Sequence, residues 1–126
     1  MSDKVAVSSY RDLLVWQKSM DLAFESYQLT RHFPAEEKFG LVSQVRRSAS
    51  SIPANIAEGH GRRSTGAFLN HLSIARGSLM ELETHLILAE RLGFLSSEHS
   101  KSKLLATEEI SRMLAGLIAS IERNKS

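Results

Sequence analysis

Two arginine pairs bracket the stretch of this sequence that is best equipped for chemistry. The segment RRSASSIPANIAEGHGRR runs from Arg46 to Arg63 and contains one carboxylate, Glu58, and one imidazole, His60. Carboxylates and imidazoles are common general acids and bases of enzymes. Arginine, in contrast, binds phosphate and carboxylate groups with two parallel hydrogen bonds. The segment is therefore a candidate for catalysis, for nucleic-acid binding or for contacts between subunits.

The rest of the sequence gives little support to catalysis. It contains no glycine-rich phosphate loop and no nucleophile elbow. Because the chain has no cysteine, disulfides, thiolate metal sites and cysteine nucleophiles are excluded. The five histidines lack metal-binding spacing, and a helix would hold His71 and His85 about 21 Å apart. We expect no catalytic residue, no metal site and no cofactor, and hence a protein that is not an enzyme.

Positive charge is concentrated in one part of the chain. The net charge of the chain is only +2 at neutral pH. Residues 38–76, however, contain six lysine and arginine residues and only one acidic residue, Glu58. Clustered arginines favour an anionic partner such as the backbone of RNA or DNA. The alternative is a set of solvated side chains beside acidic neighbours. The candidate nucleic-acid contacts are Arg62, Arg63, Arg46, Arg47, Arg76 and Lys38.

Four helices have to position these side chains. Apolar residues recur at steps of three and four over four stretches, with breaks at HFPAEE, GHGRRST and RLGFLSS. This spacing is typical of amphipathic helices, and no stretch alternates as a strand does. Short connections favour an all-α, up-down-up-down antiparallel four-helix bundle. We expect one domain over residues 1–126, with an ordered core at about 9–122.

Each helix has a face that we expect to pack in the core. The second helix spans about 35–59, the third about 65–92 and the fourth about 97–122. Serines before the last two helices are suited to cap them, and Gly93 is suited to end the third. The expected core residues are Leu13, Trp16, Met20, Ala23 and Tyr27 in the first helix, Val42, Val45, Ala49, Ile52 and Ile56 in the second, Phe68, Leu72, Ala75, Leu79, Leu82, Leu86 and Ala89 in the third, and Ile110, Leu114, Leu117 and Ile121 in the fourth.

The second helix contains a proline, Pro53, in its interior. Proline has no N–H to donate to the carbonyl four residues earlier, and its ring crowds that turn of the helix. We therefore expect the second helix to be kinked at Pro53. Ser50, Ser51 and Asn55 are suited to supply local hydrogen bonds there, and their small size lets a neighbouring helix pack closely.

Folding the second helix back on the third brings acids near the arginines. A turn close to residue 62 places the first arginine pair level with the middle of the third helix, and Glu58 near the positive end of that helix. Arg62 and Arg63 stay in the loop as the best exposed contacts for an anion. The residues expected in structural ion pairs are Arg46, Arg47, Glu58, Glu81 and Glu83.

A second apolar surface lies off the expected core faces of the first and third helices. Gly77 lies on what should be the solvent side of the third helix, where a glycine costs about 0.5–1 kcal/mol relative to alanine. Close approach of another backbone would explain both features, so we expect the chain to self-associate. The expected oligomer interface is Val15, Leu22, Leu29, Ile74, Gly77, Met80 and Ile87.

The first residues and the hydropathy of the chain indicate where in the cell the protein is located. The first residues, MSDKVAVSSYRD, contain no apolar segment of the kind found in secretory signals. No apolar run approaches the roughly 18 residues that a membrane span needs. We therefore expect a cytoplasmic protein with no membrane partner.

Three stretches of the chain resemble a known bacterial family. YRDLLVWQKSMDLA, FPAEEKFGLVSQVRRSASSIPANIAEGHGR and FLNHLSIARGSLMELETHLILAERLGFL occur in this order over about residues 10–96. Together they resemble the four-helix-bundle proteins encoded in intervening sequences of 23S rRNA genes, which are related to the accessory variability determinant proteins of diversity-generating retroelements. The most specific elements are RR-x4-SIP-x-NIAEG and IA-x-GSL-x-ELE.

The resemblance implies a four-helix bundle that assembles as a ring-like homopentamer. It also implies possible partners, because the accessory members have a positively charged surface, bind nucleic acid and associate with a reverse transcriptase. The resemblance implies no catalytic role for any residue. The matching motif positions are Arg46, Arg47, Ser51, Ile52, Pro53, Asn55, Ile56, Ala57, Glu58, Gly59, Gly77, Ser78, Glu81 and Glu83.

Two functions remain open from the sequence. The first is a non-enzymatic, homo-oligomeric module that binds the phosphate backbone of RNA or DNA through its basic segment. The second is a protein-interaction scaffold without a nucleic-acid role, in which the arginines form internal ion pairs or bind a protein.

Overall fold

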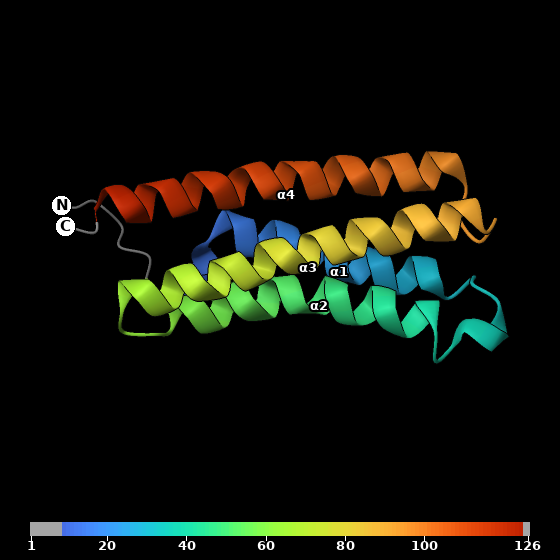
Figure 1. Cartoon of the computed structure of the whole chain (residues 1–126), viewed down its shortest axis with the longest axis horizontal. Coiled ribbons are helices and arrows are strands. Elements are labelled where there is room, and N and C mark those ends of the chain that lie inside the picture. Colours follow the sequence, from blue (N-terminus) through green and yellow to red (C-terminus); the bar gives the residue numbers. More distant parts are fainter. Residues whose placement is uncertain (1–8, 125–126) are drawn as a thin grey trace.

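The computed structural model describes residues 9–124 and folds them into four long helices that lie side by side (Figure 1). The helices are α1 (Leu14–Thr30), α2 (Leu41–His60), α3 (Thr65–Arg91) and α4 (Ser97–Arg123), and the short 3-10 turns η1 (Tyr10–Asp12) and η2 (Ala35–Glu37) precede α1 and α2. Figure 1 shows successive helices joined at alternate ends. No strand occurs between residues 9 and 124. The expected all-α four-helix bundle is confirmed.

The ends of α3 and α4 follow the local sequence signals. Ser64 Oγ and Ser96 Oγ each accept a hydrogen bond from the backbone N–H three residues later, at 3.1 and 3.0 Å. Each bond satisfies a free donor in the first turn of its helix. Gly93 follows α3 with a φ of 82°, and the N–H of Phe94 donates to the carbonyl of Ala89 at 2.9 Å. This is the glycine-ended helix terminus that the sequence predicted.

The second helix begins later than we expected. Its predicted start was near Ala35, but residues 35–37 form η2 and α2 starts at Leu41. Gly40 lies between them with φ −105° and ψ −109°, outside helical geometry. Glu37 Oε1 accepts a hydrogen bond from the N–H of Leu41 at 2.9 Å, so a side chain of the preceding turn caps α2.

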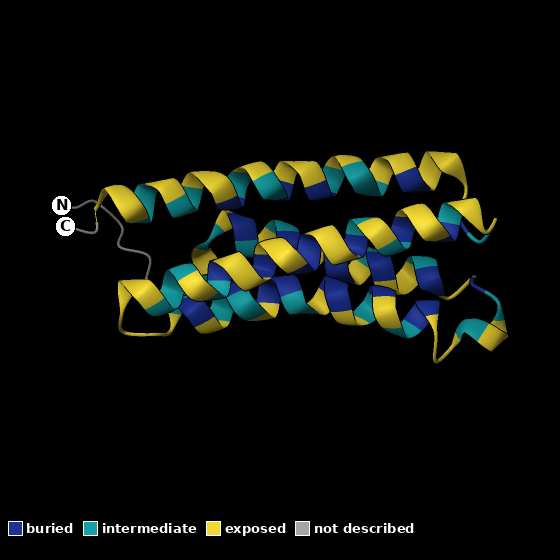
Figure 2. Ribbon diagram, viewed as in Figure 1, coloured by how far each residue is buried: buried dark blue, intermediate teal, exposed yellow. Residues whose placement is uncertain are grey.

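The core runs along the inner faces of all four helices, and its most extensive contact joins α2 and α3. Figure 2 shows the buried residues of these two helices facing each other and the bundle interior. Every core residue expected in α2 is buried, and in α3 only Phe68 is half-buried. In α4, Ile110 and Leu114 are buried, whereas Leu117 and Ile121 are half-buried. The faces predicted for α2 and α3 are therefore correct.

The face predicted for α1 is correct only in part. Ala23 is buried, and Leu13 and Trp16 pack against the core as expected. Met20 and Tyr27 were expected in the core but are exposed. Val15 and Leu22 were expected in an oligomer interface but are buried within the bundle. The buried stripe of α1 also contains three hydroxyl residues, which the apolar pattern counts as polar. These residues are Ser19, Ser26 and Thr30.

Hydroxyl residues fit in the core of α1 because most of them bond to their own helix. Ser19 Oγ donates to the carbonyl of Val15 at 2.7 Å, and Thr30 Oγ1 donates to that of Ser26 at 3.0 Å. A buried hydroxyl with such a partner avoids most of the cost of leaving water. The helix is therefore rotated about its axis from the orientation that we expected.

The helix α2 continues through Pro53, which is buried. Near it, the side chain of Asn55 donates to the carbonyl of Ser51 at 2.9 Å. The kink at Pro53 stays a prediction. No helix in residues 9–124 is long and apolar enough to span a bilayer.

Gly59 lets α2 and α3 approach each other. A Cβ atom added at Gly59 would lie 2.7 Å from the Cβ of His71 and 3.0 Å from Cδ1 of Phe68. Both distances are shorter than ordinary carbon–carbon contacts, so only glycine fits without moving α3. This close approach brings the polar side chains of the SIPANIAEG segment against α3.

Candidate binding surfaces

A chain of polar side chains crosses the interface between α2 and α3. Ser51 Oγ lies 2.8 Å from Ser78 Oγ, and Asn55 Nδ2 donates to Ser51 Oγ at 3.0 Å. Asn55 Oδ1 faces Nδ1 of His71 at 3.1 Å. Since an amide oxygen only accepts, His71 Nδ1 must carry the proton in this bond. This network fixes the register of the two helices, which is a structural role.

The network ends in a carboxylate that a loop arginine holds at the surface. Arg62 donates to Glu58 Oε2 at 2.7 Å, and His71 Nε2 lies 3.8 Å from the same oxygen. The hydrogen bond from Arg62, and then the positive charge that His71 can carry, hold the pKa of the Glu58 carboxyl below its usual value. Both partners of the Arg62 pair are about half exposed, so the pair contributes little stability.

Arg46 has different partners from those that we expected. Its Nε donates to Thr30 Oγ1 at 2.8 Å, and its guanidinium lies 4.7 Å from the ring centre of Tyr27. Arg46 therefore joins α2 to α1 and not to the acids of α3. Glu83, one of those acids, accepts instead from Thr107 Oγ1 of α4 at 2.6 Å. The predicted ion pairs of Arg46 are wrong, because its side chain points to the other neighbour of α2.

Arg47 and Glu81 lie near each other but are not paired. They line one polar hollow of about 270 Å³, together with serines of α2. No ion pair joins Arg47 to Glu81 or Glu83 within the described residues. The expected neighbourhood of Arg47 is right, whereas the expected salt bridge does not form.

The six candidate nucleic-acid contacts do not form one patch. Lys38 precedes α2 and the pair Arg62–Arg63 follows it, and a helix of 20 residues is about 30 Å long. Arg76 lies in the middle of α3 and is exposed. Arg62 and Arg63 precede the N-terminus of α3, and α4 ends with Arg123 at the same end of the bundle (Figure 1). Arg62, Arg63 and Arg123 therefore lie at one end of the bundle.

The apolar surface expected on α3 is present. Ile74, Met80 and Ile87 are 44%, 59% and 42% exposed, and Leu88 is 45% exposed. Gly77 lies on the same helix, and a Cβ added there would meet nothing within 4 Å. Leu29 of α1, expected in the same interface, is half-buried against the core. The apolar surface of α1 is made by other residues.

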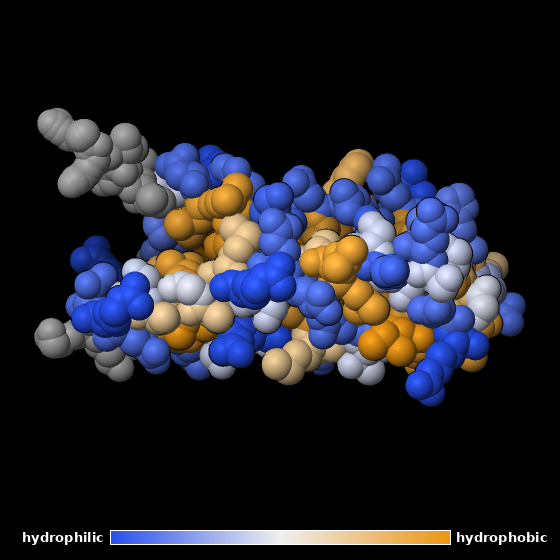
Figure 3. Space-filling view, turned by 90° about the horizontal axis from the view of Figure 1, so that it is seen from above, coloured by the Kyte–Doolittle hydropathy of each residue, from blue (hydrophilic) through white to orange (hydrophobic). Residues whose placement is uncertain are grey.

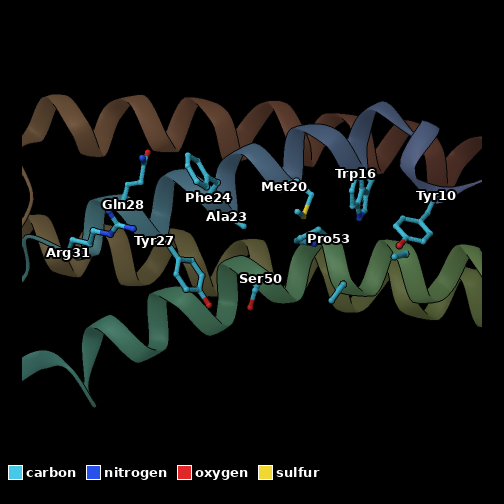
Figure 4. Close-up of a pocket in the computed structure, with 12 residues that line it drawn as sticks. Tyr10, Trp16, Met20, Ala23, Phe24, Tyr27, Gln28, Arg31, Ser50 and Pro53 are labelled. Atoms are coloured by element: carbon cyan, nitrogen blue, oxygen red, sulfur yellow. The ribbon is translucent and has the colours of Figure 1, made fainter.

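A groove of about 610 Å³ lies between α1 and α2 (Figure 4). We call it the α1–α2 groove, and Figure 4 shows the side chains of α1 along one side and those of α2 along the other. Phe24, at its rim, is 65% exposed. Among residues 9–124, its only charged lining residue is Arg31. The groove is lined by Tyr10, Trp16, Met20, Ala23, Phe24, Tyr27, Gln28, Arg31, Ser50, Pro53, Ala54 and Ala57.

A second groove, of about 640 Å³, lies between the start of α2 and the second half of α3. We call it the α2–α3 groove. Its described lining contains leucine and methionine side chains, two carboxylates and His85, but no lysine or arginine. The lining residues are Glu37, Leu41, Gln44, Met80, Glu81, Thr84, His85, Leu88 and Leu92. Figure 3 shows, from above, further hydrophobic patches among the hydrophilic side chains of the surface.

The described residues contain no group of three or more histidines or acids that could hold a metal ion. Glu58 and His60, the pair considered for acid–base work, have structural partners instead. Glu58 pairs with Arg62, and the ring of His60 packs edge-on against Phe68 at 5.9 Å. Each side chain of this pair therefore has a contact inside the bundle.

Comparisons with known proteins agree with the fold and the motifs. The model of the 23S rRNA-intervening sequence protein family matches residues 11–116. A crystal structure of a protein of unknown function from the S23 ribosomal protein family of Bacteroides thetaiotaomicron is 32% identical to this chain. It superposes with a TM-score of 0.79, covering 84% of this chain and 96% of that one. Comparison with curated proteins finds no match. This chain belongs to the family of 23S rRNA-intervening sequence proteins.

Proposed function

We propose that the protein is a non-enzymatic bundle that assembles into a homo-oligomeric ring of five copies and binds the phosphate backbone of RNA or DNA. The number five comes from the family resemblance. The assembly rests on one observation, the large apolar side chains that a single copy leaves exposed on α1 and α3. Large exposed apolar surfaces of soluble proteins often mark interfaces between proteins.

The nucleic-acid contact is assigned to the loop before α3. Arg62 and Arg63 are exposed there, beside the positive end of a helix of 27 residues. Arg62 is available to a phosphate because its exposed pair with Glu58 is worth little in water. Each copy would neutralise only a few phosphates, so binding by a single copy is weak and salt-dependent. Repetition around the ring raises the avidity.

A salt titration of nucleic-acid binding tests this assignment. Binding of structured RNA and of duplex DNA is followed by fluorescence anisotropy for the wild type and for Arg62→Ala/Arg63→Ala. The variant should lose affinity, and its slope of log affinity against log salt should fall by roughly 0.7–0.9 for each phosphate contact removed. Lys101→Ala/Arg112→Ala in α4 removes the same charge elsewhere and is the matched control. Equal affinity of the wild type and the loop variant contradicts the assignment.

A scaffold without a nucleic-acid role is the second candidate function. The observation that favours it is the commitment of two candidate arginines within the bundle, Arg46 to Thr30 and Arg62 to Glu58. If an assembled wild-type protein shows no salt-sensitive binding to RNA or DNA, the scaffold is the correct function and the exposed arginines bind a protein partner.

A further inference from the structure

The α1–α2 and α2–α3 grooves differ in the sign of their charge. Within the described part of the chain, the α1–α2 groove is lined by Arg31 and by no acid. The α2–α3 groove is lined there by Glu37 and Glu81 and by neither lysine nor arginine. Both are otherwise mainly apolar and similar in volume, at about 610 and 640 Å³. Each groove therefore complements the other better than it complements itself, because two copies of the same groove would face like charges.

The acids of the α2–α3 groove form no ion pair among residues 9–124. Glu81 forms no ion pair within residues 9–124, although Arg47 lines a neighbouring hollow with it. Glu37 accepts one hydrogen bond, from the N–H of Leu41, which leaves its negative charge in place. Arg31 is likewise exposed and forms no ion pair among these residues.

Gly77 gives a second, independent indication of a partner on α3. It precedes Met80 and Glu81 by one turn on the same helix face. Within one copy, an alanine at this position would meet nothing within 4 Å, so the fold of a single chain does not require glycine. A glycine in a helix interior costs about 1 kcal/mol relative to alanine. That cost is explained if another backbone approaches α3 at this turn.

We propose that the α1–α2 groove of one copy receives the α3 face of the next copy, so that the contact joins two different surfaces. Met80 and Leu88, which project at the rim of the α2–α3 groove, enter the aromatic groove between α1 and α2. Arg31 then faces Glu81 and Glu37 of the neighbour. This inference rests on the self-assembly proposed above and specifies its interface.

A contact between two different surfaces has a geometric consequence. Each copy keeps one free surface of each kind after pairing, so copies add head to tail, and the series ends only when a ring closes. A self-complementary contact would stop instead at two copies. The two grooves lie on two sides of α2, so one copy can contact two neighbours at once.

Complementation between two blocked variants tests the inference. Ala54→Glu places a carboxylate in the α1–α2 groove, where it faces the acids of the neighbour, and Met80→Lys places an ammonium on α3, where it faces Arg31. Both residues are exposed, so neither change disturbs the core. Each variant alone should be a monomer near 14.0 kDa, with assembly weakened more than about tenfold by the buried unpaired charge. A one-to-one mixture should form a dimer and nothing larger, because each variant retains one intact surface.

The results separate this inference from the proposed assembly. Circular dichroism and urea denaturation of the monomers establish that both variants fold. If the wild type assembles but either variant assembles equally well, the interface assigned here is wrong while self-assembly stands. A mixture of folded monomers that stays monomeric also overturns the pairing of the two surfaces. A monomeric wild type overturns both proposals.

Discussion

Replacement of Gly59 by alanine is the most direct test of how closely α2 and α3 approach. The new Cβ would lie 2.7 Å from the Cβ of His71. That atom is bonded directly to the backbone, so a change of rotamer cannot move it away. The helices must therefore separate, and overpacking of this kind costs about 1–3 kcal/mol. The higher helix propensity of alanine offsets at most about 1 kcal/mol of this cost. We expect Gly59→Ala to lower the free energy of unfolding by up to about 2 kcal/mol.

Gly116 provides a matched control for this substitution. It lies inside α4, and a Cβ added there would meet nothing within 4 Å. Gly116→Ala should therefore raise the free energy of unfolding by about 0.5–1 kcal/mol, since only the propensity changes. The difference between the two variants isolates the cost of the contact with His71 and Phe68.

Urea denaturation followed by far-UV circular dichroism measures both variants. All samples are compared at one protein concentration, because self-assembly makes the apparent stability depend on concentration. Opposite signs for Gly59→Ala and Gly116→Ala support the reasoning. If Gly59→Ala is as stable as Gly116→Ala, the helices are not in the close contact described here.

Three further predictions concern the polar groups of the bundle. Asn55→Ala should lower the free energy of unfolding by about 1–3 kcal/mol, because Ser51 and His71 lose a hydrogen-bond partner. The control Asn70→Ala, at an exposed position of α3, should change this free energy little. Equal effects of the two substitutions in urea denaturation would contradict the network. Thr107→Val keeps the shape of a buried side chain but removes the hydroxyl that donates to Glu83, so the free energy of unfolding should fall by about 1.5–3 kcal/mol. An unchanged midpoint of urea denaturation would show that water satisfies Glu83. The lowered pKa of Glu58 means that its stabilising effect is present above the unfolded pKa and is lost as pH falls through the folded pKa. In an NMR titration Arg62→Gln should raise the Glu58 pKa toward its usual value, and an unchanged pKa would show that the Arg62 pair is absent in solution.

Much of the fold follows from local patterns in the sequence. In α2 and α3 the core is made of aliphatic residues at regular spacing, so Val45, Ile52 and Leu82 identify the buried faces directly. Ser64, Ser96 and Gly93 act through their nearest backbone groups, and short-range chemistry of this kind is visible in the sequence.

The orientation of α1 and the partners of the arginines could not be obtained in the same way. Ser19 and Ser26 are buried, so a pattern that counts serine as polar rotates α1 away from its true position. That error moved Val15 and Leu22 from the core to an interface and concealed the exposed Phe24. Ser19, Ser26 and Thr30 follow the helical spacing of Val15 and Leu22, and these hydroxyl residues were the signal that could have corrected it.

Long side chains add a second source of error. Arg46 reaches Thr30 across the α1–α2 contact, whereas sequence separation and a simple fold-back placed it beside α3. The position of a residue along its helix predicts its height in the bundle. It does not predict which neighbouring helix a long side chain contacts. The α1–α2 groove was missed for the same reason, since its lining comes from two helices whose relative rotation the sequence does not give.

The mass of the wild-type protein in solution tests the central claim most directly. Multi-angle light scattering over a range of concentrations should give about five times the 14.0 kDa mass of one chain, as expected for a closed ring. A mass near that of one chain at every concentration would contradict self-assembly, and with it the interpretation of the apolar grooves.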